Sequence, residues 1–502
     1  MILEINISYI ILKFKMIRIS KSIILSLIVI SIIFSCGKKE KKDVDPKYIV
    51  AVVGEDTIFV NDIIRRSEYT VRPPYCDNDQ IFDKRIILNS LIAEILYANE
   101  ADKKNVFADN KRYNARLQGI KEQLMREKLI LIDVVDKINI PQEEIDQAYI
   151  NSKKIIHTEA VFIPKGFDPE VMYRAVENGI PLNQLSDLYP GVSKIVEKSV
   201  KWGTMDEAAQ KAIFNSNVKK GTVIKPLPTK DGYRMIKVKG WSEEIEMSPG
   251  NINQQKELVK SKINDFYIQN NYAEYAKKLM SGKRIDYFKE GWDVLVDIIK
   301  PIYIDEDNSN TELRNEELLA GNTNTHLMSV DGKNWTIGEL IDAIKIHPLE
   351  ISDHNLTNET FPHKLQAAIA SLITDTYLND IAYDREYDKL YDVNRAVKQW
   401  ERYYKAAYQR DSILEEKNFK DTLTINYFKA FEEHLNPYFE VLKKRYDPMI
   451  KYNPKALGNI KLTNLPTITY KEKGPYKEVV QPFPLITNSN KTNYKYINGM
   501  KP

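Results

Sequence analysis

The side chains that most often carry catalysis or bind metals are few and scattered in this chain. The sequence has six histidines, which are His157, His326, His347, His354, His363 and His434. Three of them fall between residues 347 and 363 at spacings of seven and nine residues. Neither spacing gives the i, i+4 pair that binds zinc on one helix face, so we expect these histidines in a solvated loop. The motifs G-x-S-x-G and G-x-G-x-x-G and the P-loop do not occur. The sequence therefore predicts no metal site and no cofactor.

Cys36 and Cys76 are the two cysteines, too few for a disulfide scaffold or a cysteine-based zinc site. Cys36 comes soon after an apolar run, Ile23–Phe34. That run is shorter than the roughly 20 residues that span a membrane. Arg18 and Lys21 precede it, which is the order of a secretory signal peptide. These features predict that the chain is exported.

The end of this run, Ile33-Phe34-Ser35-Cys36, resembles a bacterial lipobox, in which the cysteine becomes the lipidated first residue of the mature chain. The resemblance implies a lipoprotein signal peptide over residues 16–36, opened by Met16. Residues 1–15 would then come from a wrongly chosen start codon, and residues 37–47 would form a polar tether. We expect the body in the periplasm, held by its lipid to a membrane, the outer membrane in particular. An uncleaved anchor beside an incidental cysteine is the alternative.

A helical unit with a leading hairpin occurs twice. Residues 48–60 read as two short strands around a turn, and helices follow. One helix carries the i, i+3, i+4, i+7, i+8 stripe of an amphipathic helix at Leu88, Leu91, Ile92, Ile95 and Leu96. Residues 327–337 form a second hairpin, and a single constant offset places Leu91 on Leu372 and Ile92 on Ile373. Matching registers also arise by chance, but the shared element order predicts a true repeat.

Residues 154–242 have a different pattern. The strand-like segment 159–163 is followed by a helix over about residues 168–178. A second helix is expected over residues 206–214, and residues 231–238 close the segment as a strand. This order predicts an α+β domain with an antiparallel sheet.

This segment resembles the parvulin-type peptidyl-prolyl isomerase domain. The matching motifs are Trp202-Gly203-Thr204-Met205, Phe214, Lys220-Gly221-Thr222-Val223 and Gly232-Tyr233 with Ile236-Lys237-Val238. With the lipobox, the flanking helical modules resemble periplasmic folding factors of the SurA and PrsA type. The resemblance covers about residues 48–415, more weakly in the second repeat. It implies an α+β multidomain protein in which mostly helical SurA-like chaperone modules flank a small parvulin-like α+β domain.

The resemblance also assigns positions around a cup for the proline ring. Where the family pattern has a histidine in the first strand, this chain has Ala160, and where it has a histidine after the Gly-Tyr pair, this chain has Arg234. The methionine of the cup is present as Met205, but the phenylalanine four residues later is Ala209. The loop before Trp202 is short and has no clear Asp or Cys. The catalytic groups are therefore mostly replaced.

His157 lies three residues before Ala160, and odd offsets on a strand point to opposite faces. It is therefore not expected to substitute for the missing histidine. Polypeptide binding is assigned by the resemblance to Met205, Phe214 and Tyr233. We expect the isomerase fold without isomerase activity.

The remaining boundaries follow from composition. The predicted parts are a helical module over 48–150, the parvulin-like domain over 151–243, connecting helices over 244–324, a second helical module over 325–465 and a tail over 466–502. The tail is rich in Pro, Asn, Lys, Thr and Tyr and shows no periodicity. It is therefore expected to be extended or disordered, and its removal is expected to leave the melting temperature unchanged.

The near balance of basic and acidic residues argues against nucleic-acid binding. The 73 basic and 70 acidic residues give a net charge of +3, and no basic block is present, so nucleic acid is not an expected partner. The favoured function is a lipid-anchored holdase for unfolded or partly folded exported polypeptides. Two alternatives stay open, an active prolyl isomerase with an unconventional site and an adaptor lipoprotein with one dedicated partner.

Overall fold

The computed structural model describes residues 48–243, 252–304, 319–351, 356–419, 423–465, 467–471 and 473–497. The predicted signal peptide, the tether and Cys36 lie outside these residues. The described residues form helices and small sheets, which confirms the expected α+β multidomain class. They divide into two compact units, residues 130–278 and residues 48–129 with 279–497. Within the described part of the chain, no helix is both long and apolar enough to cross a membrane.

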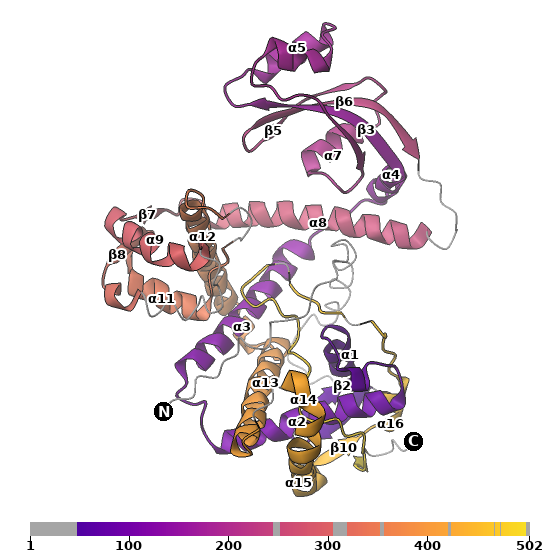
Figure 1. Ribbon diagram of the computed structural model, residues 1–502, viewed down its shortest axis with the longest axis vertical. Helices are drawn as coiled ribbons and strands as arrows, with labels where there is room; N and C mark the ends of the chain where they lie inside the picture. Colours follow the sequence, from indigo (N-terminus) through magenta and orange to yellow (C-terminus); the bar gives the residue numbers. More distant parts are fainter. Residues whose placement is uncertain are drawn as a thin grey trace. The chain divides into compact units, whose positions relative to one another are not determined.

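The larger unit contains two copies of one element order (Figure 1). The first consists of β1 (Ile49–Val53), β2 (Asp56–Phe59), α1 (Val60–Glu68), α2 (Ile81–Lys103) and α3 (Lys111–Ile130). The second consists of β8 (His326–Val330), β9 (Lys333–Thr336), α11 (Ile337–Ile346), α12 (Phe361–Asp384) and α13 (Tyr391–Glu416). The alignment that places Leu91 on Leu372 maps the whole of α2 onto α12 without its first residue. Leu91 and Leu372 are both buried, as a repeat requires.

The third helix of each copy packs on the other copy. Helix α13 runs along α2 (Figure 1). Helix α3 instead joins α12, where Arg126 donates to Asn379 Oδ1 at 2.7 Å and its guanidinium lies 3.1 Å from Asp375. Helix α13 thus contributes to the core of the first copy, and residues 48–129 and 325–465 belong to one unit. The first module predicted over 48–150 is cut at residue 130, because residues 130–150 belong to the smaller unit.

A buried polar cluster also joins α3 to the second copy. His347, at the end of α11, lies 2.5 Å from Glu122 of α3, and Asn379 and Tyr383 donate to the same carboxylate at 2.8 and 3.0 Å. Burial alone would raise the pKa of Glu122, but the hydrogen bonds, led by that of His347, hold it below its usual value. The expectation of a solvated loop is wrong for His347, because α11 ends against α3. His354 lies outside the described residues.

Of the remaining α-helices and strands of this unit, β7 and α9 precede the second copy and the others follow it. These remaining elements are β7 (Ile285–Tyr287), α9 (Lys289–Ile304), α14 (Leu423–Ala430), α15 (Asn436–Tyr446), β10 (Ile450–Tyr452), α16 (Pro454–Asn459) and β11 (Lys495–Tyr496). One sheet has the order β11-β10-β1-β2, and another has the order β7-β8-β9. Helix α2 is buried on nearly all sides because α13, α15, α16 and the C-terminal residues surround it.

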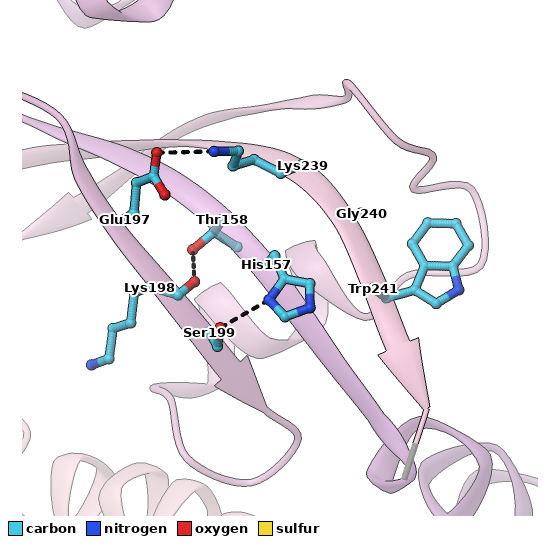
Figure 2. Close-up of a pocket in the computed structure, with 8 residues that line it drawn as sticks. All are labelled: His157, Thr158, Glu197, Lys198, Ser199, Lys239, Gly240 and Trp241. Carbon is cyan, nitrogen blue, oxygen red and sulfur yellow. Dashed lines mark hydrogen bonds and ion pairs between the residues drawn. The ribbon is translucent and has the colours of Figure 1, made fainter. Parts of the chain in front are cut away.

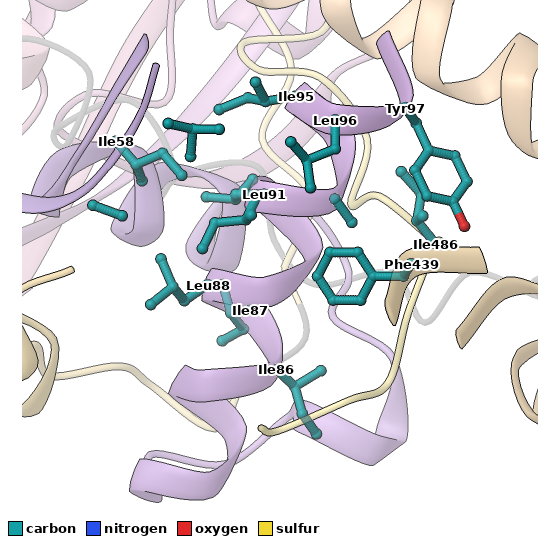
Figure 3. Packing of buried hydrophobic residues seen from close by; sticks show 14 of the residues in the cluster. Ile58, Ile86, Ile87, Leu88, Leu91, Ile95, Leu96, Tyr97, Phe439 and Ile486 are labelled. Carbon is teal, nitrogen blue, oxygen red and sulfur yellow. The ribbon is translucent and has the colours of Figure 1, made fainter. Parts of the chain in front are cut away.

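The tail is packed, which corrects the sequence-based expectation. Residues 473–497 contain no described helix, and β11 pairs with β10 in parallel. Phe483, Ile486 and Tyr494 are buried in the same cluster as α2. Figure 3 shows Ile486 beside Tyr97 and Phe439 of that cluster. The tail lacks periodicity because it forms no regular element, yet its apolar residues complete the core, so its removal cannot leave stability unchanged.

The smaller unit is built on one antiparallel sheet of order β4-β3-β6-β5. Its elements are α4 (Gln142–Ser152), β3 (Lys154–Pro164), α5 (Pro169–Glu177), α6 (Leu185–Leu188), β4 (Val196–Lys201), α7 (Glu207–Ile213), β5 (Val223–Thr229), β6 (Gly232–Glu243) and α8 (Ile252–Leu279). Helices α5 and α7 lie on opposite faces of the sheet (Figure 1). Each face therefore has its own apolar cluster, with α7 and α8 on one side and α5 and α6 on the other.

Candidate functional site

The face of the sheet that carries α7 holds most of the positions singled out in the sequence. Ala160 of β3 is paired with Ile236 of β6, and both belong to the apolar packing on this face. Met205, just before α7, packs against the same cluster. Arg234 lies two residues before Ile236 and so points to this face as well. The fold thus brings Ala160, Met205 and Arg234 to one side of one sheet.

Arg234 has an acidic partner that the sequence analysis missed. Its guanidinium lies 3.8 Å from the carboxylate of Asp206, with both side chains well exposed. Asp206 also caps α7, since its Oδ1 accepts from the backbone N–H of Ala209 at 2.9 Å. An Asp directly before a helical segment is a recognisable cap signal. Where the parvulin pattern has a neutral or proton-exchanging imidazole, this chain has a paired, permanently charged guanidinium.

Ala209 does not line an open cup. It is 1% exposed, so its methyl group is packed inside the unit. Although alanine lacks the ring of phenylalanine, no wider concavity is therefore open at this position. An alanine in a closely packed helix creates no cavity when the neighbouring groups are in contact with its methyl group.

Two of the three residues expected to bind polypeptide are not accessible on this face, one because it lies on the opposite face and one because it is buried. Tyr233 packs with the cluster on the opposite face, beside Met235. Successive side chains of a strand alternate, so Tyr233 and its neighbour Arg234 cannot both face the cup. Phe214 is buried in the core beneath α7, and its carbonyl accepts from Asn151 at 3.2 Å. Met205 alone keeps a partly exposed position on the expected face.

The position of the Trp202-Gly203 turn explains why the loop before Trp202 is short. Strand β4 pairs with β3 from Val196 to Lys201 and leads directly into Trp202, so no loop remains to carry an Asp or a Cys. Gly203 has a φ of 79°, and a Cβ there would lie 2.7 Å from Lys262 Nζ of α8. The positive φ favours glycine here, whereas the Lys262 side chain is flexible and could move aside. Burial lowers the pKa of Lys262. The ammonium group beside this turn therefore loses its proton more readily than that of an exposed lysine.

His157 lies in a pocket on the other face of the sheet. The pocket is lined by His157, Thr158, Glu197, Lys198, Ser199, Lys239, Gly240 and Trp241 (Figure 2). His157 Nδ1 lies 2.9 Å from Ser199 Oγ, and its Nε2 lies 3.2 Å from Ser242 Oγ. Both ring nitrogens are therefore bound to hydroxyl groups, and His157 is separated from Ala160 by the sheet.

Lys239, which lines this pocket, is paired with two carboxylates. Lys239 lies 2.9 Å from Glu197 and 3.1 Å from Glu159. Among the described residues, no group of three or more histidine, cysteine or acidic side chains is arranged to hold a metal ion. On the α7 face, the positions to which the parvulin resemblance assigns histidines hold Ala160 and Arg234.

Comparison with known proteins gave matches among solved structures alone. A peptidylprolyl isomerase (PrsA) from Bacillus cereus matches with 13% identity over 46% of this chain and 89% of its own, at a TM-score of 0.20. The corresponding protein from Bacillus anthracis has 12% identity over 38% of this chain and 96% of its own, at 0.18. PrsA from Bacillus subtilis has 19% identity over 39% and 82%, at 0.14. No family model and no curated protein matches the chain.

Proposed function

We propose that this protein is a lipid-anchored holdase chaperone of the bacterial envelope, which binds unfolded exported polypeptides without catalysing prolyl isomerisation. The observation that carries the proposal is the α7 face of the sheet, which holds Ala160 and the Arg234–Asp206 pair at the positions to which the parvulin resemblance assigns two histidines. Rotation about an X–Pro bond faces a barrier of about 18–20 kcal/mol. Lowering it requires groups that favour the twisted amide, and a methyl group and a paired guanidinium do not supply the polar environment that the family pattern provides.

Exposed apolar side chains on the larger unit support a role in polypeptide binding. Two segments, 68–82 and 462–470, are joined by hydrogen bonds from Thr463 to Glu68 and from Thr469 to the carbonyl of Tyr69. Their large exposed apolar side chains are Val71, Ile81, Phe82, Leu465, Ile468 and Tyr470. Exposed apolar surface of this kind suits weak contacts with partly apolar chains. Several weak sites on one protein add through effective concentration.

The proposal predicts chaperone activity without isomerase activity. Purified protein at an equimolar ratio should slow the aggregation of thermally unfolding citrate synthase several-fold, because exposed apolar segments are captured. The same protein at one-hundredth of the substrate concentration should leave the rate of proline-limited refolding of ribonuclease T1 unchanged, because the catalytic side chains are replaced. Light scattering and tryptophan fluorescence measure the two rates.

The two assays separate the alternative functions. Acceleration of refolding at the sub-stoichiometric ratio would show an active isomerase, and its loss in Met205→Ala would place the activity at the α7 face. If aggregation is unaffected and a pull-down from membranes returns one stoichiometric partner, the adaptor function replaces the holdase. Asp342→Ala serves as a control, since Asp342 is 78% exposed, belongs to neither site and should change neither rate.

Membrane attachment is predicted to depend on Cys36. Cys36→Ala removes the sulfur that a lipid would modify, and the apolar run Ile23–Phe34 is too short to span the bilayer. The variant expressed in a bacterium should therefore move from the membrane pellet to the soluble fraction after ultracentrifugation. Cys76→Ala is the matched control and should stay with the membrane. Unchanged fractionation of Cys36→Ala would contradict lipid anchoring.

A further inference from the structure

The body of the larger unit holds the tail through its main chain as well as through its side chains. Side chains of α1 and α2 donate to a series of tail carbonyls. The bonds are Arg65 to Val479, Arg66 to Pro482, Ser90 to Thr487, and Asn89 to Ser489 and Lys491, at 2.6–3.3 Å. Carbonyl groups are the same in every polypeptide, so contacts of this type place little restriction on the sequence bound.

Gln123 of α3 binds the tail as a neighbouring strand would. Its side-chain amide donates to the carbonyl of Tyr476 at 2.9 Å, and its Oε1 accepts from the N–H of the same residue at 3.0 Å. This reciprocal pair of bonds is the one that two residues exchange in an antiparallel sheet. A helix side chain thus satisfies both backbone groups of an extended residue.

Side-chain specificity is concentrated at a few buried positions. The Tyr476 hydroxyl donates to the carbonyl of Ile346, and the Arg116 guanidinium lies 5.4 Å from the ring centre. A Cβ at position 119 would lie 2.2 Å from that hydroxyl, so Gly119 makes room for it. Further along, apolar tail residues are buried at Val480, Phe483 and Ile486. We call the surface of the larger unit that contacts the tail the groove. It therefore accepts an extended segment that has one tyrosine followed by apolar residues three or four positions apart.

We infer that this groove is a binding site for extended polypeptides, and that residues 473–497 are its resident ligand, which a client segment of the same chemistry displaces. The inference rests on the proposed holdase function and names where a client binds. Displacement conserves most contacts, because an incoming segment receives the same bonds from Asn89, Ser90 and Gln123. While the tail is docked, the apparent affinity for a client is reduced by the fraction of molecules in which the groove is open. The tail therefore limits binding to segments that match it well.

The test measures exchange of the tail in the full chain. The probe is a fluorescein-labelled synthetic peptide with the sequence of residues 473–497, followed by anisotropy. Tyr476→Ala in the protein weakens its own tail, so the peptide should bind this variant at least tenfold more tightly than it binds the unmodified chain. Adding Gln123→Ala to that variant should remove the gain, because the reciprocal backbone bonds are lost. Tyr391→Ala is the matched control, since Tyr391 is 74% exposed and lies outside the peptide.

Equal affinities for the unmodified protein and Tyr476→Ala would overturn the inference. If Tyr476→Ala fails to fold, hydrogen exchange of the unmodified chain decides instead. Amides of residues 476–491 should then exchange at least tenfold faster than those of α2, and exchange at the same rate as α2 would make the tail a permanent part of the core.

The two proposals fail in different ways. Peptide exchange without slowed aggregation of citrate synthase would keep the groove and refute the holdase. Slowed aggregation without peptide exchange would keep the holdase and refute the resident ligand.

Discussion

Replacing Glu94 with alanine is expected to lower the free energy of unfolding of the larger unit by about 3–5 kcal/mol. Glu94 of α2 and Arg66 of α1 form a two-pronged pair, with N–O distances of 3.1 and 2.5 Å, and each side chain is 6% exposed. Arg66 also donates to the Gln481 side chain and to the carbonyl of Pro482. Loss of Glu94 leaves a buried cation with neutral partners alone, and a buried charge without its counter-charge is costly. Urea unfolding followed by circular dichroism measures the change.

Two further variants test the reason for this effect. Arg66→Ala added to Glu94→Ala should recover part of the loss, because the uncompensated charge is removed. Asp342→Ala is the matched surface control, since Asp342 pairs with Lys345 at 3.0 Å while 78% exposed, and it should cost less than about 1 kcal/mol. A loss below about 1 kcal/mol for Glu94→Ala would contradict the buried pair.

Ile486→Ala is expected to cost about 2–5 kcal/mol, as for other large-to-small changes in a packed core. Ile486 belongs to the tail, is 2% exposed, and packs in the cluster of Tyr97 and Phe439 (Figure 3). Truncation removes apolar contacts and leaves a cavity between α2 and α15 that the surrounding helices fill only in part. Thermal and urea unfolding of the full chain measure the loss.

Leu465→Ala is the matched control for Ile486→Ala. Leu465 is also a large aliphatic residue near the C-terminus, but it is 68% exposed, so its truncation should change stability by no more than about 0.5 kcal/mol. Equal, small effects of the two substitutions would mean that the tail does not complete the core in solution.

Local structure was largely predictable from sequence. The hairpins, the presence of helix α2 and the order of strands in residues 154–242 follow from turn residues and apolar periodicity, which act over a few neighbouring residues. The expectation of an amphipathic α2 is wrong, because the helix is buried on nearly all sides and not along one stripe. The alternation of side chains along β6 also predicts that Tyr233 and Arg234 point to opposite faces of the sheet, because adjacent residues of a strand cannot face the same side. The replacement of the catalytic groups by Ala160, Ala209 and Arg234 is a fact of the sequence itself.

Long-range packing was decided by the tertiary structure alone. Nothing in the periodicity of α3 and α13 says that each would pack on the other repeat, since an apolar stripe specifies a buried face and not its partner. The tail shows the same limit of prediction from sequence, in a segment without any periodicity. Its residues show no apolar periodicity, because they form no helix. The side chains of Asn89, Ser90 and Gln123 hold the tail in place by donating hydrogen bonds to its main-chain carbonyls. Such bonds come from residues hundreds of positions away and leave no pattern in the segment that they bind. Sequence therefore determined the elements and the missing chemistry, and the fold determined which surfaces are occupied.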